Sequence, residues 1–414
     1  MPFHWDDREK LNLDFDYLQE FNEELLDDLV MTLNDIHDTE HNSKYWRILI
    51  GYWVNTFTSV LYDRWYSIKE ATNHGGLSTI VFPLDWESLA ANDTAHFLDL
   101  ACSNDYWNHL LYLLCLPDNK KLKRVENNDS EYLADFKNSV SRPAHTLLEK
   151  VKQFVSKGLW LFKRKNSVVI FNSYLSLRDK AILNARFGQL PSLVDFLGKV
   201  KDIEYSSHFR EWRLADRVGQ DDFKKFARQT APKLMPRIFL EGYQLSKKDS
   251  ESVNLPKSTK VIFTAVSHYG DDIFKLWAAN AVSKGSKLLI GQHGGGCPDK
   301  FNASLEYEIS VADIFMSPGW SDKNNKCIRP VGNFRTPYKA TELSTNPKGG
   351  VLICCGTMPQ YAFDLRSMAL GPQTIRNYEH AFALVDLLSE SQKTKLRVRC
   401  HPSDEGWDLK ARWL

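Results

Sequence analysis

The chain has 414 residues, a length that predicts two or three domains, and it carries 53 Lys and Arg against 52 Asp and Glu. The resulting net charge of +1 argues against a protein that coats nucleic acid, because such proteins show a strong basic excess. Hydrophobic residues make up 43% and charged residues 25%, which is typical of a globular protein and excludes long disorder.

The cysteines and the apolar segments predict a cytoplasmic protein. There are 7 Cys, an odd number, and none forms a C-x-x-C pair, which favours reduced thiols over a disulfide framework or a zinc site. The start of the chain lacks a signal-peptide core, and the longest uncharged apolar stretch (48–62) is too short to span a bilayer. A basic amphipathic helix predicted at 147–165 is either a solvated face or a peripheral contact with the inner face of the plasma membrane.

The first third of the chain is predicted to be helical. Phe21, Leu25, Leu29 and Leu33 fall on one stripe of a helix, and residues 46–65 follow as a second, more buried helix. The pattern then changes to short runs of branched apolar residues at 78–83 and 167–171, which suit parallel strands buried on both faces.

From about residue 258 strands and helices alternate. The predicted elements are strands at 260–266, 287–290 and 313–316 and a helix at 272–282. This βαβ order implies a parallel sheet with helices on its faces. The sequence therefore predicts an α/β lobe over residues 1–335, with a helical N-terminal region.

A second βαβ unit follows a segment rich in proline and small polar residues. We expect residues 336–348 to be a linker, with strands at 351–355 and 396–400 and a helix at 375–389 beyond it. A Rossmann-like domain needs about five or six strands, so residues 349–414 are expected to be the start of an incomplete second lobe.

The first candidate site is the segment Gln292, His293, Gly294 and Gly295. It follows a predicted parallel strand, and ligands of open α/β sheets bind at the carboxyl ends of the strands. Glycines let backbone N–H groups approach an anion closely, and His293 could donate to a phosphate or act as acid or base. The alternative is a glycine-rich turn with a satisfied histidine.

The second candidate lies at the end of the last predicted strand. Alternation places Arg399 and His401 on one face, Pro402 ends the strand, and Ser403 adds a hydroxyl. Thr357, in the turn after strand 351–355, is expected to face the same cleft. Two cationic or donor side chains together suit a phosphate or a carboxylate.

Two further segments carry acidic residues and histidines. His268, Asp271 and Asp272 follow a strand and open a helix, where the aspartates either cap the helix or supply a general base for a sugar hydroxyl. At the N-terminus, His4, Trp5, Asp6 and Asp7 form either a second acidic cluster or an ordinary solvated helix start.

The sequence contains no G-x-G-x-x-G, Walker A or H-E-x-x-H motif. Its only D-x-D, Asp14-Phe15-Asp16, falls in a predicted helix. We therefore expect no metal.

Four segments resemble a family of bacterial surface-polysaccharide transferases from O-antigen and capsule gene regions: PFHWDDR (2–8), KYWRILIGYW (44–53), LIGQHGG (289–295) and RCHP (399–402). That family is distantly similar to capsule Kdo transferases and bacterial sialyltransferases, which have a GT-B fold and use CMP-activated sugar acids. The resemblance covers essentially the whole chain, although members of the family are usually longer.

The resemblance implies a GT-B-like fold, with the active site between an acceptor-side lobe (1–335) and a nucleotide-sugar lobe (349–414). His401 and Pro402 match the His-Pro motif that holds the CMP phosphate. The other donor-side candidates are Gln292, Gly294, Gly295, Thr357, Arg399 and Ser403. The base would be an acid of the first lobe, with Asp271, Asp272, Asp6 and Asp7 all open and His293 as a further catalytic candidate. His4, Trp5 and His268 are candidates on the acceptor side.

The function that the resemblance implies is transfer of a nonulosonic acid (pseudaminic, legionaminic or sialic acid) or Kdo from a CMP-sugar to a glycan or lipid-linked glycan. The CMP-sugar is a co-substrate, no cofactor or metal is expected, and nucleic acid is not a partner. The alternatives are a nucleotide-sugar epimerase or hydrolase on the same scaffold, and a non-catalytic polysaccharide-assembly protein.

Overall fold

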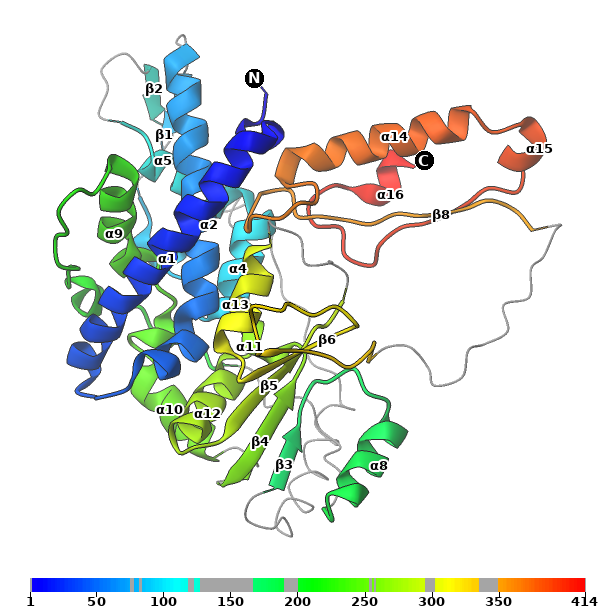
Figure 1. Ribbon diagram of the computed structural model, residues 1–414. Coiled ribbons are helices and arrows are strands. Elements are labelled where there is room, and N and C mark those ends of the chain that lie inside the picture. The colour runs from blue at the N-terminus through cyan, green and yellow to red at the C-terminus, as the bar shows by residue number, and fades with distance from the viewer. Residues whose placement is uncertain are drawn as a thin grey trace.

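The computed structural model describes residues 2–74, 78–81, 84–117, 123–126, 167–189, 200–252, 255–256, 258–294, 302–334 and 349–413 (Figure 1). Three sequence predictions lie outside these residues: the basic helix at 147–165, the linker at 336–348 and Gly295. Within the described ranges, no helix is both long enough and apolar enough to cross a membrane.

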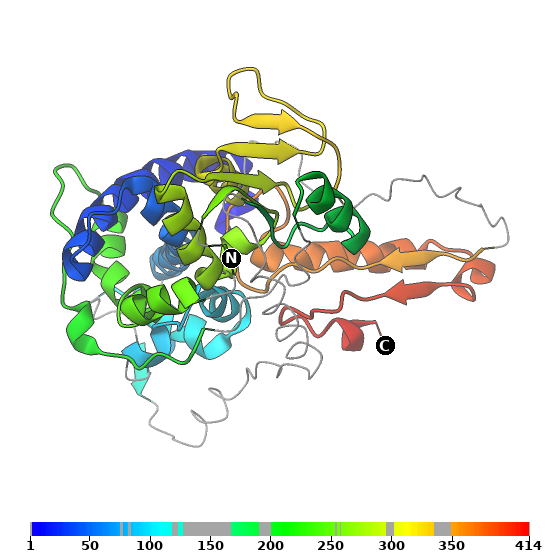
Figure 2. The same cartoon turned by 90° about the horizontal axis from the view of Figure 1, so that it is seen from below.

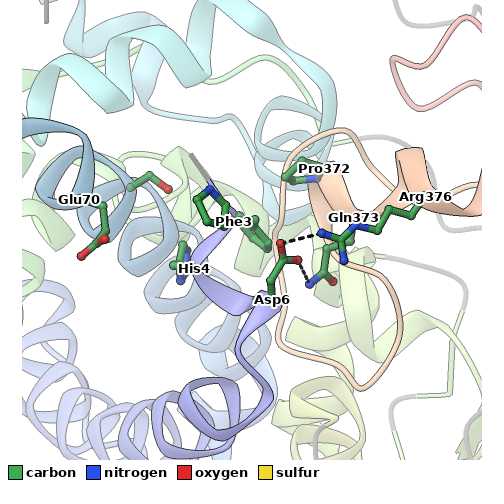
Figure 3. A pocket seen from close by; sticks show the side chains of 9 residues that line it. Phe3, His4, Asp6, Glu70, Pro372, Gln373 and Arg376 are labelled. Carbon is green, nitrogen blue, oxygen red and sulfur yellow. Dashed lines mark hydrogen bonds and ion pairs between the residues drawn. The ribbon is translucent and has the colours of Figure 1, made fainter. Parts of the chain in front are cut away.

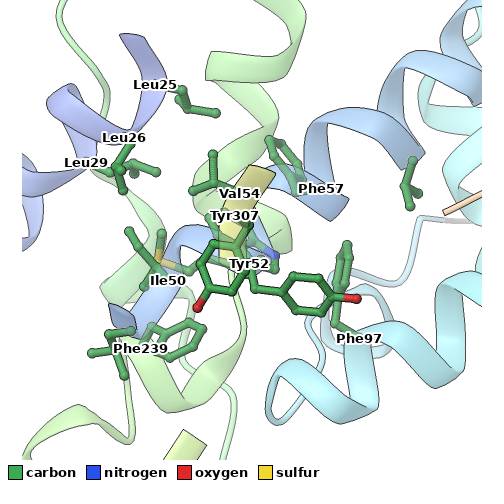
Figure 4. Close-up of a cluster of buried hydrophobic side chains, with 14 of the residues drawn as sticks. Leu25, Leu26, Leu29, Ile50, Tyr52, Val54, Phe57, Phe97, Phe239 and Tyr307 are labelled. Atoms are coloured by element: carbon green, nitrogen blue, oxygen red, sulfur yellow. The ribbon is translucent and has the colours of Figure 1, made fainter. Parts of the chain in front are cut away.

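Two long helices, α1 (Arg8–His37) and α2 (Ser43–His74), pack along each other and form the helical part of the molecule. The predicted stripe on the first helix is confirmed, because Phe21, Leu25, Leu29 and Leu33 are fully buried. The second helix is buried on all sides from residue 48 to residue 64, as its unbroken apolar run predicts. Figure 4 shows side chains of α1, α2 and later segments meeting in one core.

The main sheet has five parallel strands: β3 (Ser167–Ile170), β4 (Thr259–Thr264), β5 (Lys287–Gly291), β6 (Ile314–Ser317) and β7 (Ile328–Pro330). Their spatial order follows the sequence order. Figure 1 shows α12 (Asp272–Ser283) and α13 (Ala303–Val311) between this sheet and the two long helices. Four of these strands were predicted, but β7 was missed because its sequence, Ile-Arg-Pro, has no run of branched apolar residues.

Shorter elements complete the first part of the chain. They are η1 (His4–Asp6), α3 (Trp86–Leu89), α4 (Thr94–Ser103), α5 (Asp105–Leu114), α8 (Leu177–Arg186), η2 (Ser207–Arg210), α9 (Asp222–Leu234), η3 (Arg237–Phe239), α10 (Tyr243–Ser252) and α11 (Ser267–Gly270). The predicted strand near residue 80 is β1 (Ser78–Val81). It pairs in parallel with β2 (Lys123–Glu126) in a separate two-stranded sheet.

The second βαβ unit is present as predicted. Strands β8 (Leu352–Cys354) and β9 (Arg397–Arg399) pair in parallel, and α14 (Thr374–Asp386) lies between them in sequence. The remaining elements are η4 (Gly371–Gln373), α15 (Glu390–Lys393) and α16 (Leu409–Arg412). A small core of its own, Tyr378, Trp407 and Leu409, supports this part, which extends from the main body in both views (Figures 1 and 2).

The segment after β8 returns to the main body before α14 begins. Ala362, Leu365 and Leu370 belong to the large core, and the fully buried guanidinium of Arg64 donates to the Ala362 carbonyl. The two parts of the chain are thus joined by packing as well as by residues 335–348. The fold is mixed α/β with a parallel sheet, which is compatible with a Rossmann-like fold.

Candidate functional site

Polar side chains converge where β4 and β5 end. The turn α11 follows β4 and carries His268 and Tyr269, and the loop after β5 carries His293. At the last residue of β5, Gly291, a Cβ atom would lie 2.8 Å from the ring of Phe334 and 2.9 Å from that of Phe263. Only glycine fits this tightly packed strand end, from which the histidine loop leaves the sheet.

The carboxylate of Glu308, on α13, is the centre of this cluster. Its Oε1 accepts a hydrogen bond from the Tyr269 hydroxyl at 2.6 Å, and lies 3.1 Å from His268 Nε2 and 3.8 Å from His293 Nδ1. Burial alone would raise the pKa of Glu308, but hydrogen bonds from His268, His293 and Tyr269 outweigh burial and hold the pKa below its usual value. Glu308 is therefore a buried anion.

The two histidines differ in their exposure. His268 is enclosed, and burial lowers its pKa, so it is the neutral donor that orients Glu308. The side chain of His293 is 45% exposed, and its ring meets that of Tyr269 edge-on with the centroids 5.6 Å apart. Nδ1 of His293 faces the carboxylate, and Nε2 is the ring nitrogen on the other side. A solvent-facing imidazole in front of a buried carboxylate can take up and release a proton.

A partly buried cation contacts α13, the helix that carries Glu308. Arg366 donates from Nε to Asp364 at 2.8 Å and from a terminal nitrogen to the Ser304 hydroxyl at 3.2 Å. Burial opposes its charge, but Asp364 and the nearby hydroxyls of Tyr52 and Tyr269 keep its pKa above the usual value. Since Ser304 is one helical turn from Glu308, a permanent positive charge lies beside the histidine cluster. Such a charge suits a phosphate or a carboxylate.

The two aspartates at the start of α12 have different environments. Asp271 is the N-cap and accepts from the Phe274 N–H, and burial raises its pKa to about 7. Asp272 is fully buried, lies 2.6 Å from Lys275 Nζ and accepts from the backbone and the hydroxyl of Thr94. The contacts of Asp272 hold α4 to α12, whereas Asp271 retains a pKa in the range of a general base.

The N-terminal residues lie apart from this cluster, beside α2 and the start of α14 (Figure 3). Trp5 is fully buried and donates to Asp14, and Asp7 caps α1, so both have structural contacts. His4 lies 2.9 Å from Asp63, and Asp6 accepts from the side chains of η4 and α14.

The loop after β5 is held by side-chain contacts. Gln292 accepts from the indole N–H of Trp320 at 2.8 Å and donates to the Gly294 carbonyl at 3.3 Å. The predicted donor-binding residue Gln292 therefore shapes the loop, and His293 follows it directly.

The candidates in the second part of the chain share one edge of the small sheet. Thr357 Oγ1 lies 3.5 Å from the carbonyl of Asp404, so the loop after β8 contacts the loop after β9. Four exposed residues lie there: Arg399, His401, Pro402 and Ser403. The backbone N–H of Ser403 donates to His401 Nδ1, with 3.1 Å between the two nitrogens. Among the described residues, no hydrogen bond or ion pair joins this loop to His293, so a shared gap between them stays a prediction.

The sequence analysis missed Glu308 and Arg366. A signal for Glu308 was present, because Ser304, Glu308 and Val311 share the buried stripe of a helix, where an ionised residue needs partners. Nothing local marks Arg366. In the part of the chain that the structure describes, no group of three or more His, Cys, Asp or Glu side chains is placed to hold a metal ion.

One comparison with known proteins identifies a relationship. A family model described as LIC12162 family transferase matches residues 1–414. Neither a curated protein nor a solved structure matches the chain.

Proposed function

The chain belongs to the LIC12162 family of transferases, and we propose that the group it transfers is a sugar, from a CMP-activated donor to a glycan acceptor. The donor would be a nonulosonic acid (pseudaminic, legionaminic or sialic acid) or Kdo, and the product a surface polysaccharide such as O-antigen or capsule. In this proposal the protein acts in the cytoplasm, peripherally at the membrane when the acceptor is lipid-linked, and the two βαβ parts form a GT-B-like pair around the substrates.

The observation that carries the proposal is the pair of His293 and Glu308. Glycosyl transfer needs a group that removes the proton from an acceptor hydroxyl, and a half-exposed imidazole 3.8 Å from a buried carboxylate can do so. The carboxylate stabilises the imidazolium that forms and orients the ring, while the neutral His268 and Tyr269 orient the carboxylate.

The reaction would proceed by direct displacement at the anomeric carbon. His293 Nε2 takes the proton of the acceptor hydroxyl, the acceptor oxygen bonds to the anomeric carbon, and the bond from that carbon to the phosphate oxygen breaks. CMP leaves with the electron pair and an added negative charge. Arg366, which packs against the first part, and Arg399 and His401 in the small sheet are the cationic or donor groups that would stabilise this charge.

The test is a transfer assay with CMP-N-acetylneuraminic acid, CMP-Kdo and the CMP-nonulosonic acids, each with and without glycan acceptors. We expect His293→Gln and Glu308→Gln to lower kcat by roughly 100-fold or more, the effect typical of losing general-base catalysis. His401→Ala should weaken CMP binding in calorimetry.

The proposal fails if the protein binds and turns over none of these donors, or if both substitutions leave turnover unchanged. Release of free sugar without an acceptor would instead favour the hydrolase alternative, because the same imidazole could activate water. Acceptor binding without any donor binding would favour an assembly protein.

A further inference from the structure

A pocket lies at the junction of the two parts of the chain, away from the histidine cluster. It has a volume of about 320 Å³ and lies between the N-terminal turn, α2 and the start of α14 (Figure 3). Its walls include Phe3, His4, Ser67, Glu70 and Gln373. Its volume is at the small end of ligand pockets, which suits a molecule the size of a monosaccharide.

The lining combines apolar surfaces with hydrogen-bonding groups. Phe3 and Pro372 provide apolar surfaces, and Asp6 and Glu70 provide carboxylate acceptors, of which Asp6 already accepts from the Gln373 amide. Two carboxylates against the single guanidinium of Arg376 leave the lining with a formal charge of −1, which disfavours an anionic ligand. Apolar faces beside planar acceptors match a neutral sugar ring, which has an apolar C–H face and hydroxyl donors at its edge.

His4 forms part of the pocket wall. Its Nε2 lies 2.9 Å from Asp63, while its Nδ1 is buried and has no hydrogen-bond partner among the residues that the structure describes. Buried polar atoms without a partner are rare, because leaving one unsatisfied costs about 1–3 kcal/mol. The ring is held by Phe3 and Tyr66, with centroids 4.8 Å and 5.0 Å away. When Nε2 donates to Asp63, Nδ1 is an acceptor that the surrounding protein encloses.

The pocket is connected to the segment that joins the two parts. Asp63, beside His4, lies 2.7 Å from Arg64, and Arg64 donates to the Ala362 carbonyl. A few residues later Asp364 accepts from Ser304, on the helix that carries Glu308. A ligand in the pocket would therefore contact a network that ends at the proposed catalytic helix.

We propose that this pocket binds an uncharged sugar residue of the acceptor glycan, remote from the residue that receives the transferred sugar. The role as an acceptor subsite rests on the proposed function, whereas the binding of a neutral sugar does not. Such a subsite holds the growing chain at a distance from the reaction, so it would lower the KM for long acceptors and leave the chemical step alone.

The binding test uses saturation-transfer NMR on the full chain. Its probes are methyl β-D-glucopyranoside, methyl β-D-galactopyranoside and methyl N-acetyl-β-D-glucosaminide. The blocking variant is Ser67→Trp, which fills the pocket from α2. The matched control is Asn73→Trp, an exposed position on the same helix that adds the same side chain outside the lining. We expect at least one probe to bind, Ser67→Trp to weaken it by at least about tenfold, and Asn73→Trp to leave it unchanged.

Three results would overturn the inference: no probe binds, Ser67→Trp binds as well as wild type, or free N-acetylneuraminic acid binds more tightly than every neutral probe. If Ser67→Trp does not fold, as judged by circular dichroism, Glu70→Ala replaces it with the same expected loss. The proposed function can fail independently: in that case the protein turns over no CMP-sugar but still binds neutral glycosides. If turnover is present, Ser67→Trp should raise KM for long acceptors while kcat stays within about twofold of wild type.

Discussion

Replacing Asp271 by Asn separates the structural role of this residue from a catalytic one. Asp271 caps α12 through the Phe274 N–H, and burial raises its pKa from 3.8 to about 7. Asn is an equally good N-cap, so the substitution keeps the hydrogen bond and removes the ionisable group. In the folded protein the carboxyl holds its proton up to a higher pH than in the unfolded chain. Its ionisation therefore destabilises the fold progressively as the pH rises from about 4 to about 7.

The expected size follows from the two pKa values. A shift of about three pKa units corresponds to about 4 kcal/mol of lost stability once the pH exceeds both values. Between pH 5 and pH 8 the penalty grows by about 2–3 kcal/mol, because the unfolded carboxyl is already ionised while the folded one keeps its proton up to about pH 7. Asp271→Asn should therefore gain about 2–3 kcal/mol of stability relative to wild type over the same pH interval.

The assay is urea denaturation of both proteins at pH 5, 6.5 and 8, in which only the difference between them is interpreted. Other titrating groups contribute equally to both proteins and cancel. A difference that stays constant with pH would refute the raised pKa. Sugar transfer by the same variant tests the base: activity close to wild type is expected if His293 is the base, and loss of activity would assign that role to Asp271.

Two further substitutions test the packing around the site. Lys275→Met leaves the buried carboxylate of Asp272 without its partner and should lower the free energy of unfolding, measured by chemical denaturation, by about 3–5 kcal/mol. The control is Lys393→Met, which breaks an exposed ion pair and should lower it by less than about 1 kcal/mol. Equal effects of the two substitutions would contradict a structural ion pair between Lys275 and Asp272. Gly291→Ala forces a Cβ between two phenylalanine rings and should cost about 1–3 kcal/mol, while Gly356→Ala, which has nothing within 4 Å, should cost less than about 1 kcal/mol. An unchanged melting temperature for Gly291→Ala would show that the strand end is loosely packed.

The sequence by itself determined the elements whose patterns are local. The apolar stripe of α1, the unbroken apolar run of α2 and the branched runs of β4 and β5 identify those elements, because helix and strand periodicities are set by neighbours along the chain. The position of His293 after a strand was predictable for the same reason, since the carboxyl ends of parallel strands lie on one edge of the sheet.

Only the tertiary structure decided which side chains meet. Glu308 comes from a different helix than His268 and His293, and Arg366 comes from a segment that crosses back from the second part of the chain. The same packing enclosed Trp5 and Asp272, which the sequence left open as site residues. Contacts between residues far apart in sequence depend on how whole elements pack, and the burial that shifts a pKa depends on that packing as well.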